Sequence, residues 1–357
     1  MMTPKKKSLC IRTIESTFAI QGLSLIGVVP LGVDTKSFSH FEQWLSKGKH
    51  AGMKFLENYK ELRRDPSQIE PEMNAAIVFA LNYFQGDKVR SSSTRVAQYA
   101  RMQDYHKFMK KKAEVVADEL SKYDGFGESF RVVIDSAPIL ERSLASQTSS
   151  GFIGKNTCFI QPQKGSFYLL GEVLAKVQLN EIFEKPVYVD PGKRDPVLGG
   201  CGTCKRCQVN CPTGALESEY QLDANLCLSY WSIEHRGTIP RKIWPHFKQY
   251  WFGCDICQTV CPYNRKASTN FDLPLKDSLR NVDLYEVAVM SQRTYEELFG
   301  GSPMTRAKRA GLSRNALIAM AVTGDTRVPE AVKKIRALEG DNEMLMETCA
   351  QVEIYHM

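Results

Sequence analysis

The sequence of 357 residues contains no long hydrophobic run and no strong excess of charge of one sign. No apolar stretch approaches the ~20 residues that a membrane-spanning helix requires, so we expect no membrane partner. The lysines at positions 5–7 are followed by no apolar segment typical of a secretion signal, and the N-terminus has no twin-arginine signal. The 47 Lys and Arg residues against 40 Asp and Glu leave a net charge of +7, which permits a polyanionic partner. We therefore expect a cytoplasmic protein.

The chain also lacks two cofactor signatures. No Gly-x-Gly-x-x-Gly motif follows a predicted strand, so a nicotinamide or flavin nucleotide has no evident binding loop. The Asp-x-His-x-x-Gly signature of proteins that bind the cobalt of cobalamin through histidine begins at Asp104-Tyr105-His106, but Met109 replaces its glycine. A corrinoid bound without its lower base would need no such histidine, so this cofactor is not excluded.

Cysteine, in contrast, is concentrated in one segment. Eight of the eleven cysteines lie between Cys201 and Cys261. A Cys-x2-Cys-x2-Cys-x3-Cys-Pro run ends at Cys211, a Cys-x2-Cys-x3-Cys-Pro run starts at Cys254, and Cys227 lies between them. In such a run three thiolates bind one 4Fe–4S cluster, whereas the cysteine before the proline binds a second cluster. The predicted ligands are Cys201, Cys204, Cys207 and Cys261 for one cluster, and Cys211, Cys227, Cys254 and Cys257 for the other.

Other uses of these cysteines fit the pattern poorly. Disulfides require an oxidising compartment, which the N-terminal sequence does not indicate. Structural zinc sites use Cys-x2-Cys pairs, but not three cysteines at this spacing followed by x3-Cys-Pro. The Cys-x3-Cys-x2-Cys spacing of radical-SAM enzymes is absent, because the second run has the two spacings reversed. Cys10, Cys158 and Cys349 lie outside the runs, and we expect them to be buried apolar thiols.

The pattern of elements predicts an α+β protein with three parts. Residues 1–195 alternate strand and helix signals and should form a mixed α/β domain. Residues 196–268 should form a ferredoxin-like domain with the two clusters, and residues 269–357 a short helical region resembling part of a HEAT-type repeat. Strands are predicted at 24–29, 75–81 and 130–134, a hairpin or bent strand at Gly171, and helices at 38–45, 94–123, 285–298, 306–321 and 329–338. Residues 185–200, rich in proline and glycine, should be a linker.

Several long motifs resemble epoxyqueuosine reductases. They include Asp135-Ser136-Ala137-Pro138-Ile139-Leu140-Glu141-Arg142, Gly151-Phe152-Ile153-Gly154-Lys155-Asn156-Thr157 and Leu170-Gly171-Glu172. In the cysteine segment they include Cys211-Pro212-Thr213-Gly214-Ala215, Ser229-Tyr230-Trp231-Ser232-Ile233-Glu234 and Gly253-Cys254-Asp255-Ile256-Cys257-Gln258. The resemblance covers roughly residues 55–314, and its motifs are jointly specific.

The resemblance implies a defined activity. Such enzymes are cytosolic, bind cobalamin without its lower base, and reduce the epoxide of epoxyqueuosine at the tRNA wobble position to give queuosine. Electrons pass from an external low-potential donor through the two clusters to the cobalt. The α/β domain would then be the corrinoid-binding domain shared with reductive dehalogenases. We expect a monomer, with a smaller tRNA footprint than relatives whose C-terminal helical repeats are longer.

Asp135 matches the proton donor of this family. Opening an epoxide places charge on oxygen, and its loss as water requires a proton, so a carboxylic acid at this position is chemically reasonable. Desolvation at the end of the apolar run 132–134 would favour the neutral acid. Alternatively, Asp135 could simply cap the turn before Pro138.

The resemblance also implies further site residues. The corrinoid candidates share a position in or beside the matching motifs: Arg63, Tyr99, Asp135, Ser136, Gly154, Lys155, Asn156, Gly171 and Gly253. An arginine in the position of Arg63 is more often a solvated charge at a helix end, and Gly253 would let one cluster approach the cobalt closely. The tRNA candidates are polar or basic: Ser229, His235, Arg236, Arg306 and Arg309, with Arg241, Lys242, Lys308 and Arg314 nearby. Stacking on anticodon bases or packing in the core would each explain Trp231, Trp244, Tyr250 and Trp251.

Three rival functions stay open at this point. A reductive dehalogenase would share the cofactors and fold, but would usually carry an export signal. An electron carrier with a structural N-terminal domain would bind no corrinoid and would not depend on Asp135. A tRNA-binding module with structural clusters would bind its RNA without turnover.

Overall fold

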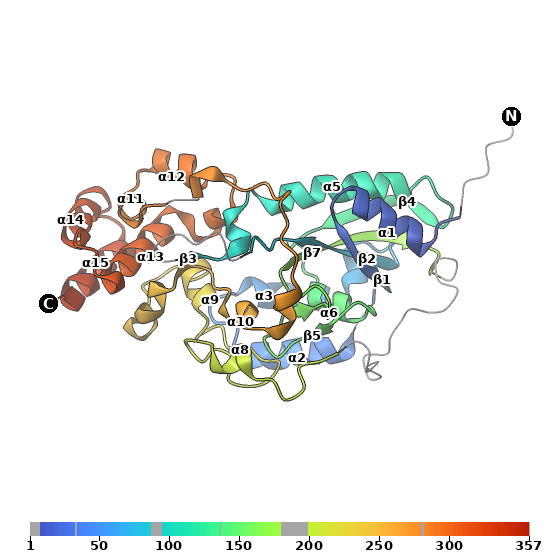
Figure 1. The fold of residues 1–357 in the computed structure, drawn as a ribbon, viewed down its shortest axis with the longest axis horizontal. Helices are drawn as coiled ribbons and strands as arrows, with labels where there is room; N and C mark the ends of the chain where they lie inside the picture. Colours follow the sequence, from blue (N-terminus) through green and yellow to red (C-terminus); the bar gives the residue numbers. More distant parts are fainter. Residues whose placement is uncertain are drawn as a thin grey trace.

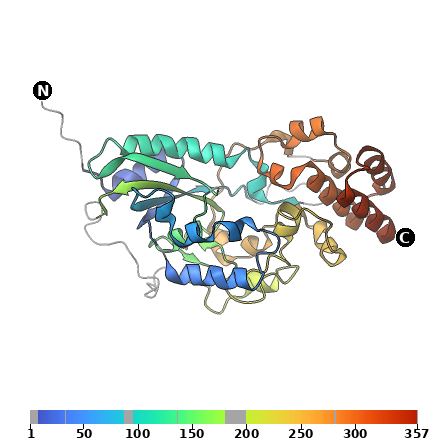
Figure 2. The same cartoon turned by 180° about the vertical axis from the view of Figure 1, so that it is seen from behind.

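The computed structural model describes residues 8–32, 34–86, 95–135, 137–179, 199–279 and 282–356. The molecule is elongated: a β-sheet with flanking helices forms one end, and the C-terminal helices form the other (Figure 1). The cysteine segment lies between these two ends and along one side, as the reverse view also shows (Figure 2). No helix in the described ranges is long and apolar enough to span a bilayer.

A four-stranded antiparallel sheet forms the core of the first end. Its order is β1-β2-β7-β4, with β1 at Ser24–Pro30, β2 at Ala75–Asn82, β7 at Tyr168–Val177 and β4 at Phe126–Val133. The strands predicted at 24–29, 75–81 and 130–134 are therefore confirmed. The central strand β2 is almost entirely buried, which explains its continuous apolar run Ala-Ala-Ile-Val-Phe-Ala-Leu.

Strand β7 runs without a break through Gly171, so the hairpin predicted there is wrong. Gly171 pairs with Phe79 of β2, and a Cβ atom at this position would lie 2.7 Å from Cζ of the Phe79 ring. The glycine therefore makes room for the aromatic ring and for Ile134, whose Cγ1 would lie 3.2 Å from the same Cβ. Gly171 has a packing role, and its prediction as a corrinoid contact gains no support from this position.

Helices cover both faces of the sheet. Helix α1 (Ile11–Ile20) and helix α5 (Tyr105–Leu120) pack on one face, and helix α6 (Glu141–Ser146) packs on the other, against β1, β2 and β7. Helix α2 (Thr35–Ser46), predicted at 38–45, lies beyond α6 (Figure 1). The helix predicted over 94–123 is correct only from Tyr105, because Asp104 caps the helix there by accepting from the His106 N–H.

Residues 95–101 instead connect the sheet end to the cysteine segment. Strand β3 (Arg95–Val96) pairs in parallel with β8 (Tyr250–Phe252), and a 3-10 turn, η2 (Gln98–Arg101), follows. The shorter elements around the cysteines and on the sheet side are α3 (Phe55–Asn58), α4 (Lys60–Arg64), η1 (Pro66–Gln68), β5 (Phe152–Ile153), β6 (Phe159–Ile160), α8 (Arg206–Val209), α9 (Leu228–Ile233), η4 (Arg241–Lys248), α10 (Ile256–Thr259), η5 (Pro262–Lys266) and η6 (Asp277–Leu279).

The C-terminal part is helical, as predicted. The helix expected at 285–298 is split into α11 (Leu284–Ala288) and α12 (Gln292–Phe299), because Ser291 caps the second one. The turn η7 (Pro303–Ala307) leads into α13 (Lys308–Thr323), and α14 (Val328–Leu338) follows. These two helices confirm those expected at 306–321 and 329–338. The last helix, α15 (Glu343–His356), was not predicted. One hydrophobic core joins these helices to residues 228–252, so the two segments pack as one body. The linker predicted at 185–200 lies mostly outside the described residues, and the three-part division stays a prediction.

Arg314 in the centre of α13 is fully buried, so its prediction as a tRNA contact is wrong. Its guanidinium donates hydrogen bonds to the carbonyl oxygens of Trp231, His235 and Gly237 at 2.6–3.0 Å and to Oδ1 of Asn315. Burial lowers the pKa of Arg314 to about 9, so the cost of burying this charge is appreciable. The hydrogen bonds offset that cost and attach α13 to the chain after α9.

Replacement of this residue should therefore destabilise the protein. Arg314→Met leaves three buried carbonyl oxygens without their donor, and we expect a loss of about 3–5 kcal/mol in the free energy of unfolding. Urea unfolding followed by tryptophan fluorescence should show a lower midpoint. Arg293→Met, on an exposed arginine of α12, should change the free energy by less than about 0.5 kcal/mol. An unchanged midpoint for Arg314→Met would contradict the structural role.

Candidate active site and cluster sites

Asp135 lies directly after β4 in a strained backbone conformation. Its φ of +53° is in the left-handed region, which residues other than glycine seldom adopt. The Asp135 N–H donates a hydrogen bond of 2.8 Å to Oε1 of Glu141, the first residue of α6. This bond holds the turn in place at the end of the sheet. Ser136, the next predicted corrinoid contact, lies outside the described residues.

The Asp135 carboxylate has two partners at the start of α5. The Tyr105 hydroxyl donates a hydrogen bond of 2.9 Å to Oδ2 of Asp135, and Nε2 of His106 lies 3.6 Å from the same oxygen. The hydrogen bond with Asp135, followed by that with Asp104, raises the pKa of His106 above its usual value. The Asp135 side chain is 62% exposed, so the desolvation expected from the preceding apolar run is absent in the chain alone.

A buried and a half-buried carboxylic acid lie near Asp135. Glu172 on β7 is fully buried, and neither of its carboxyl oxygens has a hydrogen-bond partner among the described residues. Burial is the main reason that the pKa of Glu172 is raised well above its usual value. Burial and the charge of Asp135 likewise raise the pKa of Glu141 to about 7. The site therefore keeps protons close to Asp135 at neutral pH.

Tyr99 and Gly253 connect this acid site to the cysteines. The Tyr99 ring lies 6.4 Å from that of Tyr105, centroid to centroid. Gly253, with φ +65°, immediately precedes Cys254, and a Cβ atom on it would lie 2.6 Å from Cβ of Ala97 and 3.7 Å from Cε1 of Tyr99. The structure thus brings together Asp135, Tyr99 and Gly253, three of the predicted site residues.

Arg306 comes to the same region from the helical end. Its guanidinium makes an ion pair of 2.9 Å with Glu234 and lies 5.3 Å above the centre of the Phe55 ring. The hydrogen bond with Glu234 is the main cause that raises the pKa of Arg306, and the charge of Asp135 contributes. This partly exposed arginine therefore lies close enough to Asp135 for the two charges to interact.

The other predicted tRNA residues have varied surroundings. Arg236 is exposed and donates to the carbonyl oxygens of Ile233 and Arg306. Arg309 is held by an ion pair of 2.6 Å with Glu339, and Nε2 of His235 lies 2.8 Å from the Thr238 carbonyl oxygen. Ser229 lies beside Cys227 and contacts its thiol. Of the proposed stacking aromatics, Trp244, Tyr250 and Trp251 are buried in the core, whereas Trp231 is half-buried.

Arg63 lies in the last turn of α4 and lines a small space with Ile139 and Leu140. It donates to the Leu56 carbonyl oxygen at 3.4 Å, and its guanidinium lies 6.0 Å from the centre of the Phe41 ring. Arg63 is half-buried at the end of α4, and this partial burial lowers its pKa. Its surroundings include Asp34 and Leu140, which precedes α6.

Seven of the eight clustered thiols fall into two groups of electrostatic neighbours. Cys204 follows Cys201 in one turn, its N–H bonded to the Cys201 carbonyl at 2.9 Å. Burial, then the neighbouring thiolates, raises the pKa of Cys207 to about 11, and burial is also the main cause that raises the pKa of Cys254 to about 12. Bound iron would compensate the charges of such crowded thiolates. The groups are Cys201, Cys207 and Cys261, and Cys211, Cys227, Cys254 and Cys257.

These groups fit the predicted ligand sets of two 4Fe–4S clusters, although the individual ligands stay predictions. In the described part of the chain, no three His, Cys, Asp or Glu side chains gather around a position for one metal ion. A cubane needs no such arrangement, because each cysteine binds a different iron.

The turn at Gly154 contacts the cysteine segment. The Lys155 N–H donates to Sγ of Cys201 at 3.3 Å, and the buried Lys155 amine donates to the Gly202 carbonyl oxygen at 2.7 Å. The Asn156 side chain donates to the Cys257 carbonyl oxygen at 3.2 Å. The polar groups predicted for the corrinoid at Lys155 and Asn156 are thus occupied by the cluster segment.

The three cysteines outside the runs have different environments. Cys349 is buried, as predicted, but Cys10 is exposed. Cys158 is half-buried, its thiol donates to the Asn156 carbonyl oxygen at 3.8 Å, and it is an electrostatic neighbour of Cys257, so its prediction as a buried apolar thiol is wrong. The sequence offers no signal for this proximity, because Cys158 lies 99 positions before Cys257.

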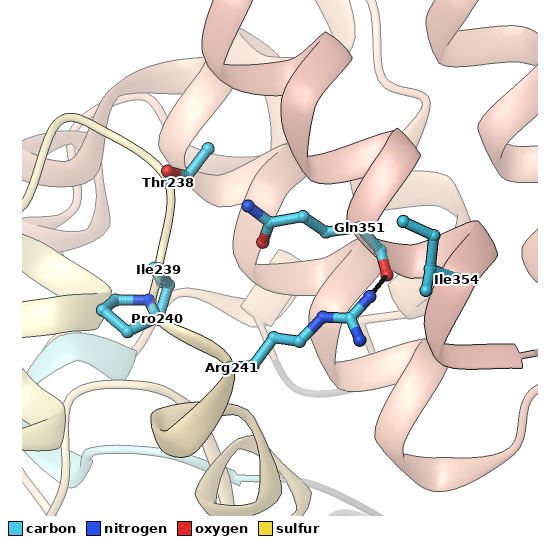
Figure 3. A pocket seen from close by; sticks show the side chains of 6 residues that line it. All are labelled: Thr238, Ile239, Pro240, Arg241, Gln351 and Ile354. Carbon is cyan, nitrogen blue, oxygen red and sulfur yellow. Dashed lines mark hydrogen bonds between the residues drawn. The ribbon is translucent and has the colours of Figure 1, made fainter.

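A separate cavity of about 360 Å³ lies between residues 238–241 and α15 (Figure 3). Ile239, Pro240 and Ile354 line it, and Arg241 points across it to donate a hydrogen bond of 2.6 Å to the Gln351 carbonyl oxygen. The cavity shares no residue with the site around Asp135, and none of the groups that could donate a proton lines it.

The chain is similar to known proteins over most of its length. A family model described as "Epoxyqueuosine reductase QueG, DUF1730" matches residues 63–136, and one described as "4Fe-4S double cluster binding domain" matches residues 200–264. The epoxyqueuosine reductase of Francisella cf. novicida (strain Fx1) is 30% identical over 344 residues, which cover 92% of each chain. The chain belongs to the epoxyqueuosine reductase family. The epoxyqueuosine reductase of Pseudomonas aeruginosa is 33% identical to this chain over 313 residues, which cover 85% of this chain and 83% of the relative.

Solved structures of epoxyqueuosine reductases share the fold. One, a complex with an epoxyqueuosine-modified stem loop of tyrosine tRNA, has a TM-score of 0.80 at 25% identity, covering 96% of this chain and 88% of that one. Another, from Bacillus subtilis, has a TM-score of 0.80 at 24% identity, and its catalytic aspartate loop is swung out of the active site. This chain is thus an epoxyqueuosine reductase with an iron–sulfur domain.

Sequence reasoning missed four neighbours of Asp135, namely Tyr105, His106, Glu141 and Glu172. His106 offers a test of the local electrostatics. Because its pKa is raised from 6.5 in the folded state, its charged form stabilises the protein below pH 6.5, and this stabilisation is lost as the pH rises through the raised value. His106→Asn should therefore lower the urea midpoint more at pH 5.5 than at pH 9.

The matched control is His40→Asn, at an exposed histidine of α2. It should leave the urea midpoint unchanged at both pH values. A loss for His106→Asn that is equal at both pH values would show that the imidazolium makes no net favourable interaction with Asp135 and Asp104.

Proposed function

We propose that the enzyme reduces epoxyqueuosine to queuosine at the wobble position of tRNA, with electrons passing from two 4Fe–4S clusters to cobalamin bound without its lower base. The observation that carries the proposal is the position of Asp135, between proton-bearing side chains and the glycine that precedes Cys254. An acid and an electron source at one site are what the removal of an epoxide oxygen requires.

The chain's own groups supply the protons. Conversion of an epoxide to an alkene consumes two electrons and two protons and releases water. Asp135 donates a proton to the epoxide oxygen as its carbon–oxygen bond breaks, and Tyr105 orients the carboxyl group through its hydrogen bond. Glu141, whose pKa is about 7, and His106 lie close enough to keep the site supplied with protons.

Cobalamin would lie on the open side of Asp135. The carboxylate is 62% exposed, and its protein partners approach from α5 only, so room is left for a cofactor and a substrate. The corrinoid would supply a strongly nucleophilic, low-potential cobalt centre when bound. Tyr99, Gly253 and Asp135 are the residues we assign to its surroundings. We assign the turn at Gly154 to the clusters rather than to direct contact with the corrinoid.

The tRNA would approach between the two ends of the molecule. Arg236 and Arg306 present charge at the surface beside the acid site, which suits contact with phosphates rather than with bases. The related enzyme that binds a modified stem loop of tyrosine tRNA supports this partner.

Anaerobic turnover of epoxyqueuosine-containing tRNA tests the proposal. With cobalamin and a low-potential reductant, the wild-type enzyme should form queuosine, and Asp135→Asn should lose about 10²–10⁴-fold in rate because it cannot donate the proton. Asp118→Asn, on the exposed face of α5, should keep the wild-type rate.

A protein that holds both clusters and cobalamin but forms no queuosine would contradict the tRNA assignment. It would favour a small-molecule reductase of the reductive-dehalogenase type. Full activity of Asp135→Asn would instead remove Asp135 from the reaction while leaving the substrate unchanged.

A further inference from the structure

The two cysteine runs contain the same local unit, Cys-x2-Cys-x3-Cys-Pro, and fold in the same way. Helix α8 forms in the run that ends at Cys211, here called the first run, and α10 forms at the same place in the second run. Between the first two cysteines of this unit, the first run has Lys205 and Arg206. The second run has Asp255 and Ile256 at these two positions. The surroundings of equivalent positions can therefore be compared directly.

In the second run both positions are covered by the rest of the protein. Asp255 is 3% exposed, and its carboxylate accepts the Gln98 N–H at 2.7 Å. Ile256 packs against the hydrophobic core of the helical end. Gly253, which directly precedes this unit, lies against Ala97. The second run thus faces inward, toward the segment that carries Tyr99 and leads to the acid site.

In the first run the equivalent positions face solvent. Lys205 and Arg206 are exposed, and neither forms an ion pair with a described residue. Val209, the last residue of α8, is 76% exposed, and α8 lies at an outer edge of the molecule (Figure 1). Each of these three residues is at most two positions from Cys204 or Cys207, so its Cα atom lies within about 8 Å of that of a predicted ligand. The exposed charges therefore lie next to the cluster assigned to the first run.

The turn η5 adds two exposed cations beside the same predicted cluster. It follows Cys261, and its last residues, Arg265 and Lys266, are exposed. The Tyr263 hydroxyl donates to the Gly200 carbonyl oxygen at 2.9 Å, which holds η5 beside the start of the first run. Exposed cations thus lie on both segments that supply the predicted ligands of this cluster.

Acidic residues near this surface do not cancel its charge. Glu219 is paired with Lys155 at 2.7 Å, and the exposed Glu217 lies beside α8, where the Gln208 side chain donates to the Leu216 carbonyl oxygen. The cations of α8 and η5 outnumber this one acid. A surface with an apolar residue among exposed cations steers an acidic protein toward it and gives it an apolar contact on arrival.

We propose that the loop before α8, α8 itself and η5 form the docking surface for an acidic protein that carries a low-potential one-electron donor. Each docking oxidises the donor by one electron and reduces the cluster bound by Cys201 by one electron, so one epoxide requires two dockings. The electron then passes to the cluster bound by Cys254, which faces the acid site. The inference rests on the ligand sets in the proposed function and deepens it by naming where electrons enter.

The rate of cluster reduction by reduced flavodoxin, an acidic flavin protein used as the probe, tests the docking surface. In anaerobic stopped-flow measurements at low salt, the double variant Lys205→Glu, Arg206→Glu should lower the second-order rate constant about ten- to hundredfold, because attraction becomes repulsion. With reduced methyl viologen, a small cation that needs no docking surface, its rate should not fall. Iron content checks that the variant holds both clusters.

The matched control is the double variant Lys176→Glu, Lys333→Glu, which changes the net charge equally at two exposed lysines of β7 and α14. It should be reduced by flavodoxin at the wild-type rate. Equal losses in the control, or a loss with methyl viologen as large as with flavodoxin, would overturn the proposal. So would weaker binding of a tRNA stem loop to the Lys205→Glu, Arg206→Glu protein with unchanged reduction by flavodoxin, because the surface would then belong to the RNA.

The wild-type protein gives a test that does not depend on folding of a variant. Its rate constant with reduced flavodoxin should fall steeply from about 0.05 M to about 0.5 M NaCl, as salt screens the attraction. A rate constant independent of salt would overturn the proposal. Cluster reduction is measured without tRNA, so absence of queuosine would refute the proposed substrate and leave the docking surface standing.

Discussion

The approach of Ala97 to Gly253 is the constraint on which the rest of the site depends. Only a glycine with φ +65° allows the two backbones to come so close, since a Cβ atom there would lie 2.6 Å from that of Ala97. The buried Asp255 carboxylate strengthens the junction by accepting the Gln98 N–H at 2.7 Å, and burial raises the pKa of Asp255 to about 6. This junction places Tyr99 beside the cysteines. It also positions the chain up to Arg101, and helix α5 begins four residues later at Tyr105.

The second constraint is the strained turn at Asp135. A left-handed conformation at a residue other than glycine costs on the order of 1–3 kcal/mol, and hydrogen bonds from Asp135 to Glu141 and from Tyr105 to Asp135 offset this cost. The pKa values of the buried Glu172 and the half-buried Glu141 near the turn are raised, whereas Arg306 and Arg236 beside it present positive charge. Proton donors, the proposed electron source and a surface suited to phosphate therefore meet where the two ends of the molecule join.

Sequence reasoning predicted what depends on local pattern. Apolar runs identified the main strands, and the cysteine spacing proposed two groups that the neighbouring thiols also form. Contacts made by tertiary packing could not be predicted from the sequence. Nothing in the local sequence distinguishes Arg314 from an exposed arginine, yet it is buried and donates to three carbonyl oxygens and to Oδ1 of Asn315. Tyr105 reaches Asp135 across 30 positions, and Lys155 and Asn156 point to the cluster segment, because the fold and not the motif decides which cofactor a loop touches.

The central claim is that clusters, corrinoid and Asp135 share one site. Electron paramagnetic resonance of the anaerobic enzyme with cobalt(II) cobalamin and reduced clusters tests it most directly. We predict a cobalt signal without nitrogen splitting from a lower ligand, broadened by magnetic coupling to the cluster bound by Cys257. A cobalt signal with nitrogen splitting and no coupling to either cluster would place the corrinoid elsewhere and contradict the account.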